Sequence, residues 1–263
     1  MTVAINDAYA VTVPDPVPAF GLPLTPVTMR ETVEAVNALI AAGVPRYFIT
    51  ANLNYAMLTA NDAELSGVNR GAAFVLADGM PLVWAARRTG RHFPERVAGS
   101  DLLFELSAEA ARKGHRVFLL GGKDGVAAEA AARLTARYPG LHVVGIEVPP
   151  FRRRTPEEED AMIARVRAAR PDLLFCALGQ PGGEKWLAAN VERLGVPACV
   201  QVGASLDFAA GRVRRCPRFV ARIGMEWAFR FAVEPRRLGG RYWRNALFLA
   251  RRVLFPSGTA TTN

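Results

Sequence analysis

The stretch Phe74-Val-Leu-Ala-Asp-Gly-Met-Pro-Leu-Val-Trp84 changes character in its middle. Residues 74–77 are apolar and predict a buried strand, whereas residues 81–90 predict a helix. Asp78 and Gly79 stand between the two. A carboxylate at the end of a buried strand suits a surface turn or a helix cap as well as a catalytic base. The segments on either side are needed to choose between these interpretations.

The same alternation of strand and helix continues along the chain. Apolar strands are expected within residues 46–54, 115–122 and 172–181. Helix starts are marked by Thr28, followed by Glu31 in a capping-box pattern, and by Thr155. Alternating strands and helices predict an α/β fold, here a Rossmann-like and mostly parallel sheet with helices on both faces.

The positive charge is concentrated near the C-terminus. The 263-residue chain carries a net charge of +9, yet residues 212–252 alone contain twelve arginines and two acids. We therefore expect a disordered, proline-rich tail over residues 1–20, an α/β core over 21–211, a basic and aromatic helical appendage over 212–255, and a short tail over 256–263. A localised basic surface suits phosphates or anionic lipids.

Several classes of protein are disfavoured by the sequence. There is no apolar run of about 20 residues that would span a bilayer, and the N-terminal residues do not resemble a secretory signal. The three cysteines and three histidines are dispersed, so we expect no metal site, no cofactor and a reducing cytoplasm.

Small and polar residues follow the predicted strands. In parallel sheets, ligands bind beyond the carboxyl ends of the strands, so these residues are candidates for a site. They are Thr50, Asn52, Asp78 with Gly79, Gly121 with Gly122, and Gln180. The glycine pair suits backbone contacts to phosphate, although taken alone a plain strand-to-helix turn is the better explanation, and the dinucleotide fingerprint is absent.

Several ordered motifs make the chain resemble the WecG/TagA/CpsF glycosyltransferases, a family that includes teichoic-acid N-acetylmannosaminyltransferases. The resemblance covers residues 21 to about 248. The motifs are GLPLTPVTMRETV, TANLNY, LADGMPLVWAARRTG followed by ERVAGSDL, RVFLLGG, PPFR, LGQPGGEKW, VGASLDFAAGRVRRCP and GMEWAFRFAVEPRRLGGRYWRN.

The resemblance implies an inverting, metal-independent transferase at the cytoplasmic face of the membrane. It would move a sugar, most often N-acetylmannosamine, from a UDP-sugar donor to a saccharide on a polyprenyl diphosphate. By the same resemblance Asp78 is the general base, and Arg96 is a partner for diphosphate. The other substrate-binding positions are Thr50, Asn52, Gly79, Asp101, Gly121, Gly122, Gln180, Glu184, Arg230, Arg237 and Arg241.

One motif departs from the family pattern G-x-P-(K/R)-Q-E. This chain has glycine at both 182 and 183, where the family has a basic residue and a glutamine. Gln180, three residues earlier, is a candidate to supply the missing amide. The departure leaves the donor open, with UDP-glucose or a UDP-uronic acid as alternatives to UDP-N-acetylmannosamine.

The arginine-rich appendage has two structural interpretations. It is either a pair of helices packed on the core with arginines in solvent, or a basic and aromatic face for an anionic membrane. Nucleic-acid binding is disfavoured because no nucleic-acid motif is present. A non-catalytic UDP-sugar binder and a homo-oligomer are further alternatives that the sequence leaves open.

Overall fold

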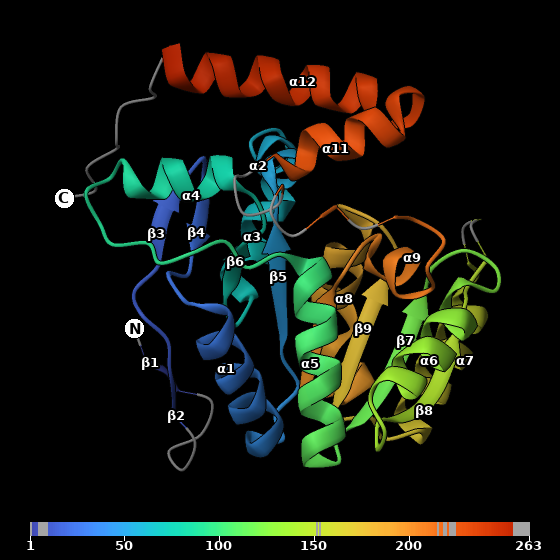
Figure 1. The fold of residues 1–263 in the computed structure, drawn as a ribbon. Helices are drawn as coiled ribbons and strands as arrows, with labels where there is room; N and C mark the ends of the chain where they lie inside the picture. Colours follow the sequence, from blue (N-terminus) through green and yellow to red (C-terminus); the bar gives the residue numbers. More distant parts are fainter. Residues whose placement is uncertain are drawn as a thin grey trace.

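The computed structural model describes residues 2–4, 10–150, 152, 154–214, 216–217, 220 and 225–254, apart from the side chains of 2–4, 10–12, 237 and 253. A six-stranded sheet in the order β6-β5-β10-β9-β7-β8 forms its centre, and every neighbouring pair of strands is parallel (Figure 1). The strands are β5 (Tyr47–Ala51), β6 (Val75–Ala77), β7 (Arg116–Gly121), β8 (His142–Glu147), β9 (Leu173–Ala177) and β10 (Ala198–Gln201).

Helices cover both faces of this sheet, which confirms the predicted architecture. One hydrophobic core joins the sheet to α1, α5, α6 and α9, and the other joins it to α2, α3, α4, α7 and α8. Neighbouring strand residues serve opposite cores, as Phe48 and Ile49 do in β5. The helices are α1 (Met29–Ala42), α2 (Leu53–Thr59), α3 (Ala63–Gly71), α4 (Met80–Arg87), α5 (Gly99–Lys113), α6 (Val126–Arg137), α7 (Pro156–Ala168), α8 (Gly182–Leu194) and α9 (Ser205–Ala209).

Both predicted helix starts are confirmed. Thr28 and Thr155 accept hydrogen bonds from the backbone N–H groups of Glu31 and Glu158, and each glutamate completes a capping box. These contacts satisfy donors that the first helical turn leaves unpaired. The sequence did not reveal the break between α2 and α3, nor α9, which occupies a stretch expected to be loop.

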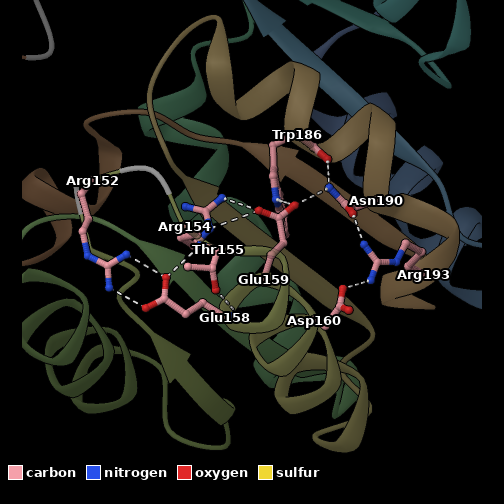
Figure 2. Close-up of polar contacts among 9 residues, drawn as sticks. All are labelled: Arg152, Arg154, Thr155, Glu158, Glu159, Asp160, Trp186, Asn190 and Arg193. Carbon is pink, nitrogen blue, oxygen red and sulfur yellow. Dashed lines mark hydrogen bonds and ion pairs between the residues drawn. The ribbon is translucent and has the colours of Figure 1, made fainter.

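A polar network joins α7 to α8 (Figure 2). The Glu159 carboxylate accepts a hydrogen bond of 3.1 Å from the Trp186 indole N–H. It also forms an ion pair with Arg154, at an N···O distance of 3.3 Å. Arg193 bridges Asn190 to Asp160 on the neighbouring helix. The network fixes α8 against α7, and the first turn of α8 carries the predicted site residue Glu184.

The N-terminal residues do not all behave as the expected tail. Two short hairpins form there, β1 (Thr2–Ala4) with β2 (Ala10–Thr12), and β3 (Val17–Ala19) with β4 (Leu22–Leu24). Val17 and Leu24 are fully buried in the core that includes α4. The boundary expected at residue 21 thus falls inside the β3–β4 hairpin, where apolar residues on both sides of the turn at 20–21 pack together.

The C-terminal segment forms α11 (Glu226–Val233) and α12 (Pro235–Leu254), which lie across the edge where the parallel strands end (Figure 1). Within the described residues, no helix combines the length and apolarity needed to cross a bilayer. The appendage thus covers the edge at which ligands bind in such sheets.

We expect Gly121→Ala to destabilise the fold. Gly121 has φ of +97°, and a Cβ atom there would lie 2.7 Å from the Ala177 carbonyl on neighbouring β9. Strain and overpacking together should lower the free energy of unfolding by about 2 to 4 kcal/mol, measured by urea denaturation. Gly182→Ala is the control, because nothing lies within 4 Å of its Cβ position. Equal urea midpoints of unfolding for the two variants would contradict the tight contact between Gly121 and Ala177.

Candidate active site

Asp78 lies directly beyond β6, at the edge covered by the appendage. Its backbone N–H donates a 2.7 Å hydrogen bond to the Ala51 carbonyl at the end of β5. Gly79 follows with φ of +155°, a conformation that glycine tolerates, and α4 begins at the next residue. The strand end and the glycine turn therefore fix the carboxylate at the sheet edge.

Burial raises the pKa of Asp78 to about 6. The positive charge of Arg96 opposes this shift, Glu226 reinforces it, and the Gly99 N–H group and Arg230 lower the pKa further. The carboxylate is thus mostly deprotonated at pH 7 and still basic enough to accept a proton. These are the properties of a general base.

Arg96 lies among carboxylates, in the segment between α4 and α5. One guanidinium nitrogen is 2.6 Å from a Glu226 oxygen, and another is 3.7 Å from Asp101. Asp78 acts on Arg96 as a further negative charge. The structure therefore brings together the predicted residues Asp78, Arg96 and Asp101.

Glu226 was missed by the sequence analysis. It stands at the start of α11 and reaches Arg96 across 130 residues of chain. One sequence feature pointed to it, since Glu226 is one of only two acids in the arginine-rich stretch 212–252. The appendage thus contributes a carboxylate to the surroundings of Asp78.

The predicted arginines of the appendage differ in position. Arg230 lies 5.3 Å from the centre of the Phe208 ring, close enough to Asp78 to lower its pKa. Arg241 lies 5.7 Å from the ring of its neighbour Tyr242. The side chain of Arg237 falls outside the described residues. Among the appendage arginines whose side chains the structure describes, Arg230 is the one placed near the Asp78 carboxylate.

A cleft of about 970 Å³ opens beside this group. Met80, Arg96, Asp101 and Glu226 line it, together with Phe208 of α9. Most of its lining comes from α4, α5 and the segment between them, and the appendage contributes Glu226. A ligand in this cleft would contact Arg96 and lie next to the turn that carries Asp78.

A second polar group occupies the ends of β5 and β9. The Thr50 hydroxyl donates to the Gln201 carbonyl at 3.1 Å, and Asn52 donates to the Gln180 side chain at 3.1 Å. Asn52 also caps α2 by accepting from the Tyr55 N–H. Thr50, Asn52 and Gln180 therefore lie together as predicted, and their hydrogen bonds also shape the strand ends.

Glu184 is almost completely buried in the first turn of α8. Burial raises the pKa of its carboxyl to about 7, although its own backbone N–H and the nearby Gln180 amide lower it. Gln201, which the sequence analysis did not select, is buried next to the same turn. A glutamine within the apolar run 198–202 was the available indication.

Gly121 and Gly122 lie far from Asp78, next to the end of β9. β7 stands four positions from β6 in the sheet, which is roughly 19 Å at ordinary strand spacing. The Gly122 N–H already donates to the Ala177 carbonyl, and α6 begins only at Val126. Asp78 and the glycine pair are thus separate parts of the same sheet edge.

Asp78 has a raised pKa and Arg96 lies beside it, at strand ends that the basic appendage covers (Figure 1). This arrangement suits an enzyme that acts on an anionic substrate. The chain belongs to the Glycosyl transferase WecG/TagA/CpsF family, whose model matches residues 17–259. It is a glycosyltransferase. It is similar to the N-acetylglucosaminyldiphosphoundecaprenol N-acetyl-beta-D-mannosaminyltransferase of Bacillus subtilis (strain 168), with 28% identity over 205 residues, 78% of this chain and 76% of the relative.

Proposed function

We propose that this enzyme moves N-acetylmannosamine from a UDP-sugar to a saccharide carried on a polyprenyl diphosphate, with inversion and without a metal ion. The observation that carries the proposal is the Asp78 carboxylate, held at the strand ends with a raised pKa and Arg96 nearby. The name of the Bacillus subtilis relative supplies the sugar and the lipid-linked acceptor.

In the proposed reaction, Asp78 removes the proton of the acceptor hydroxyl. The hydroxyl oxygen bonds to the anomeric carbon as the bond from that carbon to the UDP oxygen breaks, and a single displacement inverts the configuration. Negative charge then grows on the departing diphosphate. Arg96 and Arg230 supply positive charge near Asp78, and guanidinium groups bind phosphate through paired hydrogen bonds.

The transfer is tested by measuring UDP release in the presence of EDTA, using polyprenyl-diphosphate-linked N-acetylglucosamine as acceptor. UDP-N-acetylmannosamine, UDP-N-acetylglucosamine, UDP-glucose and UDP-glucuronic acid are compared. Release that requires the acceptor and is fastest with UDP-N-acetylmannosamine supports the proposal. Faster release with another donor would change the sugar and keep the reaction. No release with any donor, also with native membrane extracts as acceptor source, would overturn it.

We further propose that the appendage of residues 212–255 binds an anionic membrane, where a lipid-linked acceptor resides. Large apolar side chains of α11 and α12 are exposed, with Trp227, Trp243 and Leu254 more than half accessible. Arginines accompany them along α12. This mixture of exposed apolar and basic residues is typical of helices that lie in a membrane interface.

Vesicle flotation should detect this binding and show its electrostatic part. We expect association with phosphatidylglycerol vesicles that weakens as salt rises, and little with phosphatidylcholine alone. The double change Arg251→Gln and Arg252→Gln should lower affinity by roughly thirtyfold, at about 1 kcal/mol for each arginine. Arg167→Gln, an exposed arginine on α7, is the control. Binding that ignores salt and lipid charge would contradict this role.

A further inference from the structure

Two polar side chains, those of Glu184 and Gln201, are buried at the carboxyl edge of the sheet. Glu184 and Gln201 are each 1% exposed. Within the part of the chain that the structure describes, neither side-chain polar atom of Gln201 has a hydrogen-bond partner. Among the same described residues, neither carboxyl oxygen of Glu184 has a partner at hydrogen-bond geometry, although the Gln180 amide and the Glu184 N–H lie close enough to lower the Glu184 pKa. Buried polar groups without partners destabilise a fold, so such a pair needs another explanation.

Both residues lie at the start of α8: Glu184 is in its first turn, and Gln201 packs beside the preceding residue, Gly183. Gln201 ends β10, which lies between β5 and β9, and its carboxamide packs against the backbone of Gly183. A Cβ atom on residue 183 would overlap that carboxamide. The glycine at 183 and the glutamine at 201 are therefore linked, because a side chain at 183 would displace the Gln201 amide.

This contact explains the sequence departure at residue 183 in physical terms. The amide that the sequence analysis sought in Gln180 is present on β10, in the space that a side chain at position 183 would enter. Gln180 has another role, since it accepts from Asn52 and its amide is near the Thr50 carbonyl. Gln201 is thus the amide that remains available.

We propose that Gln201 and Glu184 bind the hydroxyl or acetamido groups of a substrate sugar. A carboxamide offers one acceptor and two donors, and a carboxyl group accepts or donates according to its protonation, which together suit such groups. Gln180, which is half-buried and lies near Glu184, would have to move aside to admit the sugar. The inference rests on the proposed function and adds a residue that determines which sugar is used.

Gln201→Met tests the proposal, because methionine keeps the length of the side chain and removes its polar atoms. We expect the KM of either the donor or the acceptor to rise by at least about tenfold. The affinity for UDP alone, measured by titration calorimetry on the full chain, should not change. A donor effect assigns the pair to the UDP-linked sugar, and an acceptor effect assigns it to the acceptor sugar. The melting temperature should not fall, because no hydrogen bond within the described chain is lost.

Gly183→Ala gives a second test through the same contact. It should raise the same KM in the parent chain by pushing the Gln201 amide away, and should add little to Gln201→Ala, where the contact is absent.

An equal loss of UDP and UDP-sugar affinity in Gln201→Met, or KM values within twofold of the parent for both substrates, would overturn the inference while transfer itself stands. A parent enzyme that neither transfers sugar nor binds any UDP-sugar would overturn the proposed function, and this inference with it.

Discussion

Asp78→Asn is expected to lower kcat by about 10²- to 10⁴-fold, the usual contribution of a positioned general base. Asparagine keeps the shape of the side chain and cannot accept the proton of the acceptor hydroxyl. Affinity for the UDP-sugar should change little, because the lost interaction acts on the acceptor proton. UDP release and donor titration measure the two quantities separately. Activity within threefold of the parent would remove Asp78 as the base.

The same variant should be more stable than the parent at neutral pH. Burial raises the pKa of Asp78 from its ordinary 3.8 to about 6, so the fold favours the protonated form. The stability that this preference provides is complete below pH 4 and is lost as the pH rises through 6. The shift corresponds to about 3 kcal/mol at pH 7 to 8, which asparagine should recover.

Thermal unfolding at two pH values checks this expectation. The melting temperature of Asp78→Asn should exceed that of the parent at pH 7.5, and the difference should shrink toward pH 4. Asp124→Asn is the matched control, since it makes the same chemical change at an exposed carboxylate. A variant that melts below the parent at pH 7.5 would mean that the charged form of Asp78 stabilises the fold.

Local sequence patterns predicted the elements of the fold and not their order. Capping residues at Thr28 and Thr155 and apolar strand runs depend on neighbours in the chain, so both could be predicted. The order β6-β5-β10-β9-β7-β8 depends on how the crossovers pack, which no short pattern records. The distance between Asp78 and the Gly121–Gly122 pair follows from that strand order, so it could not be predicted from the sequence.

The site could be predicted only in part, for a related reason. Asp78, Thr50 and Asn52 each follow a strand, so the rule for parallel sheets selects them. Gln201 is the last residue of its strand and faces inward, and Glu226 arrives from α11 far along the chain. Their roles come from tertiary contacts with Gly183 and Arg96, which become visible only once the elements are packed.

Arg96→Met should lower kcat/KM by about 10²- to 10³-fold if Arg96 meets the charge of the departing diphosphate. It should also change the pH dependence of kcat. Arg96 is the strongest influence that lowers the pKa of Asp78, so its loss raises that pKa and moves the acidic limb of the profile to higher pH. Methionine preserves much of the apolar stem, which limits the change to the charge.

Glu226→Gln should shift the pKa of Asp78 in the direction opposite to Arg96→Met. Glu226 raises the pKa of Asp78, so its removal should move the acidic limb to lower pH, and Arg96 should keep its positive charge near Asp78. Both variants are compared with the parent by pH profiles of kcat at saturating donor and acceptor. Limbs that move in opposite directions identify Asp78 as the titrating base and place the appendage in its electrostatic surroundings. Limbs that stay fixed, or move together, would show that another group titrates in the reaction.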